Sequence, residues 1–143
     1  PRTQLVELTL EHPTALLHSI PPHPTQLTLK ARPDAAGNIA LLVDNARKNV
    51  MVTPADGYAI TVSATRYLTR RMTGVELSAG AVIPVPALLA GDLNSDNVVN
   101  SIDGSILSDH WGRMFSNADI NRDGKVNSLD WGYIRKNFLV FGD

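Results

Sequence analysis

Apolar and polar residues alternate along several short stretches of the first part of the chain, which predicts β-strands. Tyr58, Ile60, Val62 and Ala64 alternate with small or polar residues, the period-two pattern of a half-buried strand. Similar alternation occurs at residues 6–10, 27–29, 39–43 and 50–52. Turn-forming sequences separate these stretches at residues 21–22, 32–34, 36–38, 54–57 and 78–80. Many short strands with frequent turns predict an all-β, Ig-like sandwich over residues 1–88.

The last third of the chain has the spacing of short helices instead. Ile102, Ile106, Leu107 and Trp111 are spaced as one helical stripe, and Leu129, Tyr133, Ile134 and Phe138 repeat this spacing. We expect both stripes to pack inward, with Trp131 off the stripe, and Ser101 and Ser128 to serve as N-caps. No helix is predicted before either one, because Pro84 and Pro86 interrupt the first approach and residues 116–118 are too few.

Each predicted helix follows a twelve-residue acidic loop, and the two loops agree at seven of their twelve positions. Loop 1 is residues 92–103 and loop 2 is residues 119–130. Oxygen-bearing side chains occupy positions 1, 3, 5, 9 and 12 in both, the ligand spacing of an EF-hand loop, in which position 7 supplies a backbone carbonyl. The candidate ligands are Asp92, Asn94, Asp96, Val98, Asn100 and Asp103 in loop 1, and Asp119, Asn121, Asp123, Lys125, Asn127 and Asp130 in loop 2.

This donor set favours calcium, a hard cation that takes six to eight oxygens in irregular geometry. Gly124 suits the sharp turn at position 6, whereas loop 1 has Asn97 there, so we expect loop 1 to bind somewhat more weakly. Position 12 is Asp in both loops rather than Glu. A single loop of this kind is often an ordinary Asx-rich turn, but two in register favour a pair of Ca²⁺ sites. Such a pair would stabilise a segment too small to hold a large core.

The doubled loop-helix pattern, opened by Gly91-Asp92, resembles the dockerin family over residues 90–142. The resemblance implies a small α domain with pseudo-two-fold symmetry that binds two calcium ions and docks its parent protein onto a cohesin module. It also implies an extracellular or cell-surface location. The contact positions that it suggests are Ser101, Ile102, Ser108, Asp109 and Arg113 in the first repeat, and Ser128, Leu129, Arg135, Lys136 and Val140 in the second.

The two suggested contact faces differ in charge. Ser108 and Asp109 stand in one repeat where Arg135 and Lys136 stand in the other. Opposite charges at matching rim positions discriminate between partner orientations. We therefore expect a partner to prefer one of the two orientations, although both faces could equally be solvated helix surfaces.

The preceding segment resembles a prealbumin-like or carboxypeptidase regulatory-like sandwich, as in an X-module. The likeness rests on residues 56–67 and 73–80. It implies a spacer or packing partner for residues 89–143. A carbohydrate-binding role would need exposed aromatic residues, and the candidates are Tyr58, on the core stripe, and Tyr67. His12, His18 and His23 fit no regular ligand geometry and are expected to be surface loop residues. Arg66, Arg70 and Arg71 are expected to be a solvated strand end.

Composition narrows the function further. The formal net charge of −1 gives no electrostatic case for nucleic acid, and no apolar run is long enough for a membrane span. Without a nucleophile motif, a phosphate loop or a cysteine, the segment is predicted to be non-catalytic. It begins with proline and is interpreted as the end of a larger secreted protein, for example a glycoside hydrolase.

Two classes of function remain open. One is a docking module that binds a cohesin in trans, and the other is a calcium-stabilised structural tail that packs on its own β domain. The short apolar linker at residues 84–90 allows either. The exposure of Ser101, Ile102, Ser128 and Leu129 distinguishes between them.

Overall fold

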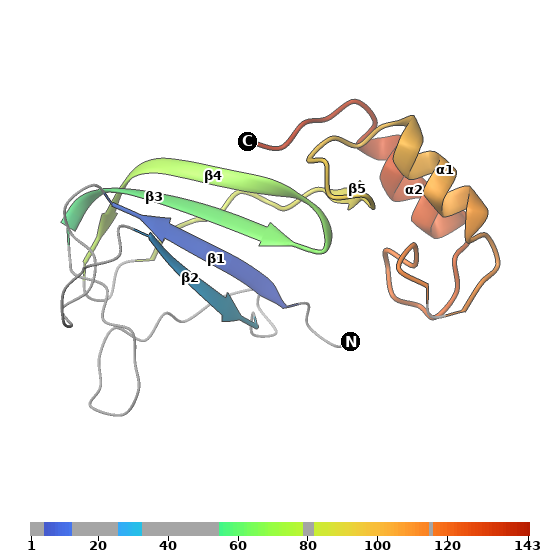
Figure 1. Ribbon diagram of the computed structural model, residues 1–143, viewed down its shortest axis with the longest axis horizontal. Coiled ribbons are helices and arrows are strands. Elements are labelled where there is room, and N and C mark those ends of the chain that lie inside the picture. Colours follow the sequence, from blue (N-terminus) through green and yellow to red (C-terminus); the bar gives the residue numbers. More distant parts are fainter. Residues whose placement is uncertain (1–4, 13–25, 33–54, 79–81, 115) are drawn as a thin grey trace. The chain divides into compact units, whose positions relative to one another are not determined.

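The computed structural model describes residues 5–12, 26–32, 55–78, 82–114 and 116–143 (Figure 1). The elements in chain order are β1 (Val6–Glu11), β2 (Gln26–Ala31), β3 (Ala55–Ala64), β4 (Arg66–Leu77), β5 (Ala90–Asp92), α1 (Ser101–Asp109) and α2 (Ser128–Lys136). The chain divides into two compact units. The sheet unit comprises Pro1–Val62 and Arg71–Pro86, and the loop–helix unit comprises Ser63–Arg70 and Ala87–Asp143. The turn of the β3–β4 hairpin thus groups with the loops and helices.

The strands are hydrogen-bonded in the order β2-β1-β3-β4-β5. β1 and β2 are antiparallel, as are β4 and β5. The predicted alternation is confirmed, because Val6, Leu8 and Leu10 are buried in β1, as are Tyr58, Ile60 and Val62 in β3. The described strands form one sheet, and the predicted strands at residues 39–43 and 50–52 lie outside the described residues.

Polar residues pair across β1 and β2 on the opposite side of these strands from the core. The hydroxyl oxygens of Thr9 and Thr28 are 3.3 Å apart, and Gln26 Nε2 donates to Glu11 Oε1 at 2.9 Å. Lys30 and Glu7 form an exposed ion pair at 3.6 Å. Directly opposed polar pairs of this kind help to fix strand register, because a slip of one residue would turn them toward the core.

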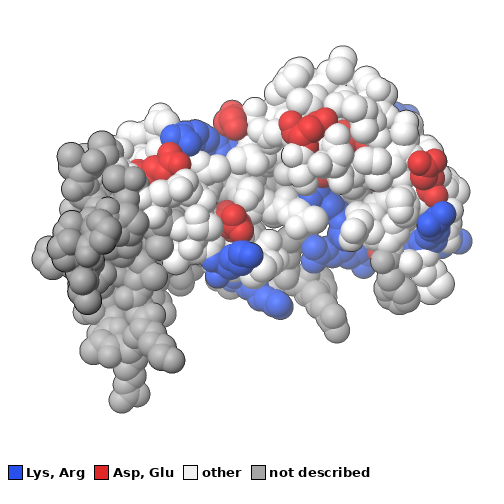
Figure 2. Space-filling view, viewed as in Figure 1, with Lys and Arg blue, Asp and Glu red and all other residues white. Residues whose placement is uncertain are grey.

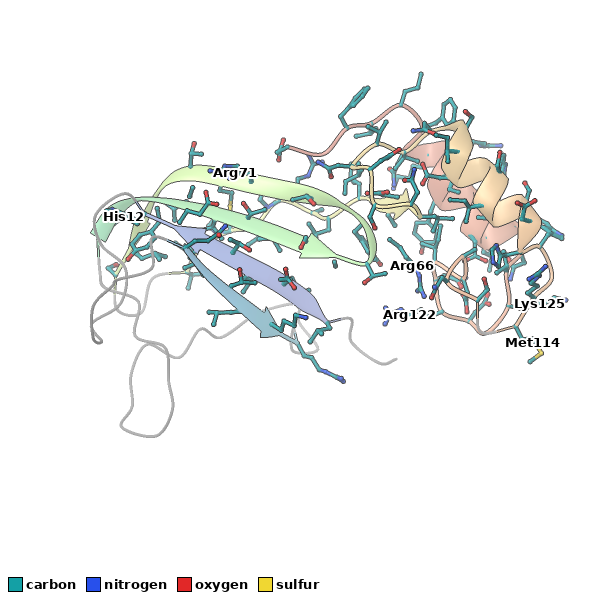
Figure 3. All side chains as sticks on the ribbon, in the orientation of Figure 1. His12, Arg66, Arg71, Met114, Arg122 and Lys125 are labelled. Atoms are coloured by element: carbon teal, nitrogen blue, oxygen red, sulfur yellow. The ribbon has the colours of Figure 1, made fainter. Side chains whose placement is uncertain are left out.

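Two expectations for the sheet unit were wrong. Residues 55–57, predicted as part of a turn, begin strand β3. His12, predicted as a surface residue, is buried, and its ring lies 4.7 Å from the ring of Tyr58 (Figure 3). The aromatic contact gives the imidazole an apolar neighbour, and burial raises the pKa of the Tyr58 hydroxyl. His18 and His23 lie outside the described residues.

The loop–helix unit has its own core, in which α1 and α2 lie side by side (Figure 1). Its buried members are Leu68, Ala90, Val99, Leu107, Ala118, Ile120, Val126 and Ile134. Only one residue of each predicted helical stripe, Leu107 or Ile134, is therefore fully buried. Trp111, expected to pack inward, is 54% exposed, because these helices of nine residues share their core with loop residues instead of burying a whole face.

The predicted loop-then-helix order is confirmed. Within residues 82–114 and 116–143 the only helices are α1 and α2, each beginning near the end of an acidic loop, with no helix leading into that loop. In the described part of the chain, neither helix has the length and apolarity that crossing a membrane requires.

The two repeats exchange the segments that follow their helices. Val99 of loop 1 donates its N–H to Val140 O at 3.0 Å and accepts from Leu139 N–H at 2.8 Å. Val126 of loop 2 makes the equivalent bonds, donating to Arg113 O at 3.0 Å and accepting from Gly112 N–H at 2.9 Å. The exit segment of each helix therefore pairs with the loop of the other repeat.

Candidate functional site

Both helices begin at the ninth position of their loop. Asn100 and Asn127 are the N-caps, and their side-chain oxygens accept the N–H of Ile102 and Leu129 at 2.7 Å. The prediction that Ser101 and Ser128 are the caps was wrong by one residue. Asparagine and serine cap helices about equally well, so the local signal could not separate the two neighbouring positions.

The aspartates at position 12 join the two ends of each loop. Asp103 Oδ1 accepts Leu93 N–H at 2.7 Å and Asn94 N–H at 3.4 Å, and its Oδ2 accepts Asn100 N–H at 2.8 Å. Its side chain is fully buried. It lies in the first turn of α1, where the helix dipole favours a negative charge.

Loop 2 repeats this arrangement around Asp130, which is also fully buried. Its Oδ1 accepts Ile120 N–H at 2.7 Å and Asn121 N–H at 3.1 Å, and its Oδ2 accepts Asn127 N–H at 2.9 Å. The short aspartate side chain therefore reaches the start of its loop because the first turn of the helix carries it there.

The side chains at positions 3, 5 and 9 converge on each other. In loop 1, Asp96 Oδ2 accepts from Asn94 Nδ2 at 2.8 Å and from Asn100 Nδ2 at 3.5 Å. In loop 2, Asp123 Oδ2 accepts from Asn121 Nδ2 at 2.9 Å and from Asn127 Nδ2 at 3.2 Å. The hydrogen bonds that these asparagine amides donate lower the pKa of both carboxyl groups, which are exposed to solvent and favour the ionised form.

The aspartates at position 1 are buried, and the one in loop 2 has an oxygen without a hydrogen-bond partner. Asp92 accepts Ser95 N–H at 2.7 Å and Asn97 N–H at 3.0 Å, yet burial raises the pKa of its carboxyl group. Asp119 Oδ2 accepts Gly124 N–H at 2.9 Å, while its Oδ1 is buried without a hydrogen-bond partner. Such an orphaned acceptor is costly, and a cation bound beside it would remove the cost.

These oxygens fit calcium. In the described residues, no three His, Cys, Asp or Glu side chains gather as a metal cluster, so amide and backbone oxygens would have to complete each site. Asparagine side chains can supply carbonyl oxygens to such a site. A mixed set of carboxylate, amide and carbonyl oxygens is the usual coordination of Ca²⁺.

The suggested partner contacts are mostly exposed. Ile102 and Leu129 are 53% and 61% exposed at the first turns of the two helices. The other exposed members are Ser101, Ser108, Asp109, Arg113, Ser128, Arg135 and Lys136. Val140 differs, because it is partly buried against the core. Two apolar side chains in equivalent places therefore face solvent directly behind the two loops.

Charge separates the two helices as the sequence indicated. α2 ends with Arg135 and Lys136, which favour its C-terminal dipole, whereas α1 ends at Asp109 without a basic residue in its last turn. On the face shown in Figure 2, acidic and basic side chains stand in small separate groups among uncharged surface. The face shown carries no broad field of one sign of charge.

The contacts of the hairpin turn with the loops were not predicted from the sequence. Arg66 Nη1 donates to Asp119 O at 3.0 Å, and Thr69 N–H donates to Asn97 Oδ1 at 2.8 Å. Arg66 is half-buried and Arg70 forms an ion pair with Asp143 at 3.6 Å, so the expectation of a solvated strand end was wrong for both. Arg71 is exposed and bonds Glu11 at 2.7 Å (Figure 3). No pattern in the sequence places residues 66–70 beside a loop.

Comparison with known proteins agrees with this architecture. Residues 90–139 match the family model described as the dockerin type I domain, so the predicted resemblance is confirmed for that segment. No curated protein matches the chain significantly.

Two similar solved structures come from Acetivibrio cellulolyticus. They are interface mutants, one N-terminal and one C-terminal, of a type II cohesin–X-dockerin complex. The first is 18% identical with a TM-score of 0.61, and the second is 19% identical with a TM-score of 0.64. Each match covers 95% of this chain and 83% of the other. These likenesses are of fold, and they support the reading of an X-module-like sheet region followed by a dockerin-like domain.

Proposed function

We propose that this chain is a non-catalytic docking module that binds a cohesin and depends on two calcium ions to do so. The observation that carries the proposal is the exposure of Ile102 and Leu129 at equivalent places, each directly behind a loop whose position-12 aspartate fixes the start of the helix. Ordering the loops would thereby order the two apolar contact residues. Both features occur twice, as a two-fold docking surface would require.

The ligands that we propose are the twelve residues named from the sequence. Asp92, Asn94, Asp96, Asn100 and Asp103 would use side-chain oxygens in loop 1, with the Val98 carbonyl, and their counterparts would do so in loop 2 with the Lys125 carbonyl. Calcium would supply positive charge to carboxylates that repel one another. Sites of this kind are filled readily where calcium is plentiful, which favours a secreted parent protein.

The alternative functions fit less well. A structural tail that packs on its own β domain is the other candidate, and it gives no reason for an exposed apolar residue at the first turn of each helix, as Ile102 and Leu129 are. Carbohydrate binding would need exposed aromatic residues on the sheet, but Tyr58 is buried and Tyr67, in β4, is partly buried against the core of the loop–helix unit. A trans partner therefore accounts best for the exposed apolar residues.

The test is calorimetric titration of the chain with cohesins of both type I and type II, in calcium and in EDTA. Binding in calcium alone is expected. Ile102→Asp and Leu129→Asp together should weaken it by about a hundredfold or more, since apolar anchors often contribute about 2 kcal/mol each. Val82→Asp, a change at an apolar residue that is 88% exposed in the sheet unit, is the matched control. Failure to bind any cohesin, or equal binding in EDTA, would contradict the proposal.

A second measurement isolates the calcium. Trp111 and Trp131 are the only tryptophans and both lie in the loop–helix unit, so their fluorescence reports its unfolding. At free calcium about a thousandfold above the dissociation constant, each site should add about 4 kcal/mol of stability. EDTA should therefore unfold this unit at lower denaturant, while amide exchange along β1 stays the same.

A further inference from the structure

The turn of the β3–β4 hairpin contacts both loops, and it does so through a different residue in each. At loop 1, Thr69 N–H donates to Asn97 Oδ1 at 2.8 Å, and Asn97 Nδ2 donates to the backbone oxygen of Asp143 at 3.3 Å. Gly142 N–H returns a bond to Asn97 O at 2.9 Å. Position 6 of loop 1 is therefore held between β4 and the last residues of the chain.

Loop 2 is held at position 1 instead. The guanidinium of Arg66 donates to the backbone oxygen of Asp119 at 3.0 Å, next to Arg122 (Figure 3). Arg66 has a φ of +75°, an uncommon backbone conformation for arginine. Its side chain extends from the hairpin turn to loop 2. Its half-buried position limits its freedom to move away from the loop.

A comparison of the two position-6 residues shows what the Asn97 side chain contributes to the contact with Thr69. Asn97 and Gly124 both have positive φ, +66° and +102°. A Cβ added to Gly124 would meet nothing within 4 Å, whereas a Cβ on Gly142 would overlap the Asn97 amide. Glycine would satisfy the backbone of loop 1 at least as well as asparagine. The asparagine side chain therefore serves the contact with Thr69 and Asp143 rather than the turn.

We propose that Asn97 and Arg66 are positioning residues for the two calcium loops, Asn97 for loop 1 and Arg66 for loop 2. The hairpin turn would hold each loop near its ligand-binding geometry before the ion arrives, so less ordering would have to accompany binding. This rests on the proposed calcium function and adds that contacts between the loops and the hairpin turn tune their affinity. By linkage, calcium in loop 1 would in turn protect the Thr69 N–H from exchange.

The experiment is a calorimetric titration of the full chain with calcium. In parallel, the amide NMR signals of residue 97 and Gly124 report on loop 1 and loop 2. Asn97→Gly should weaken loop 1 by about tenfold, the effect of losing one or two hydrogen bonds, and leave loop 2 within twofold. This direction opposes the sequence expectation, in which glycine is the better residue at position 6. Arg66→Met should weaken loop 2 by about fivefold.

Two further variants separate positioning from general damage. Arg66→Lys, which keeps a donor, should stay within about twofold of the parent in loop 2. Arg71→Met removes an arginine of the same strand that bonds Glu11 in the sheet unit, and both calcium constants should stay the same. Equal or tighter binding of loop 1 in Asn97→Gly would overturn the role of Asn97, and equal loop 2 binding in Arg66→Met would overturn that of Arg66.

Amide exchange at Thr69 tests the same idea by a second measurement. Calcium should slow exchange of the Thr69 N–H by about tenfold, and Asn97→Gly should abolish this slowing. No change at Thr69 while calcium binds would contradict the proposal. A chain that binds no calcium at all would instead contradict the proposed function, so the two failures are distinguishable.

Discussion

The two repeats of the loop–helix unit share one backbone framework. They differ at position 6 of the loop, where Thr69 of β4 contacts loop 1. Their position-12 aspartates make the same three kinds of backbone bond, and their exit segments pair with the opposite loop in the same register. Residues 97 and 124 differ because only loop 1 meets Thr69 there. The two repeats thus share a loop framework, and position 6 differs, where loop 1 alone contacts β4.

The largest expected effect tests the shared framework. Asp103→Ala or Asp130→Ala leaves three backbone N–H groups without their acceptor, each costing about 1–3 kcal/mol. Either change should remove about 3 kcal/mol or more from the stability of the unit, measured by denaturation with tryptophan fluorescence. Asn117→Ala, at an exposed residue between the repeats, is the control. A loss below about 1 kcal/mol in one repeat alone would show that the repeats are not equivalent.

A second comparison concerns the residues that end the helices, Asn137 and His110. Asn137 is buried and its Nδ2 donates to Ala90 O at 2.6 Å, joining α2 to β5. His110 is partly exposed, and its ring nitrogen Nδ1 lies 2.8 Å from Ile106 O within its own helix. Asn137→Ala should cost about 2 kcal/mol and His110→Ala less than about 1 kcal/mol in the same denaturation assay. Equal costs would mean that the bond to β5 adds nothing.

The smallest expected effect concerns two helical glycines. A Cβ at Gly132 meets nothing within 4 Å, so Gly132→Ala should raise stability by about 1 kcal/mol through helix propensity. A Cβ at Gly104 would lie 3.3 Å from the Trp131 ring, so Gly104→Ala should gain less. Combining it with Trp131→Ala should restore the gain, and a double-mutant cycle measures the difference. Additivity in that cycle would show that the ring moves aside freely.

Gly104 and Trp131 occupy equivalent positions in the two repeats, and the two helices approach each other where these residues meet. Trp131, 40% exposed, lies over Gly104 of the other repeat, where a larger residue would displace it. The sequence predicted only that Trp131 would lie off the apolar stripe of its helix. Its contact with Gly104 was not foreseeable, because it depends on how the helices cross.

The sequence predicted the framework of the loop–helix unit well, because ligand spacing and helix starts are local properties. Asp92 to Asp103 and Asp119 to Asp130 could be aligned directly, and α1 and α2 followed from what came after them. Burial was harder to predict. Ile102 and Leu129 carry the same apolar signal as Leu107 and Ile134, yet only the latter two meet loop residues in the core.

Long-range contacts were out of reach from a single sequence. Arg66, Arg70 and Arg71 form one basic run, but they bond Asp119, Asp143 and Glu11, respectively. His12 similarly gave no sign that it would stack beside Tyr58. These partners are set by the fold of the hairpin and by the path of the chain's last residues, and spacing along the sequence carries no record of either.

Because each exit segment pairs with the loop of the other repeat, the two repeats cannot be separated or truncated independently. Leu139 and Val140 complete loop 1, while Gly112 and Arg113 complete loop 2. Neither repeat therefore carries a complete loop of its own, since the segment that pairs with each loop belongs to the other repeat. Truncating the tail after α2 would damage the earlier loop, farther back in the chain, before it damaged the later one.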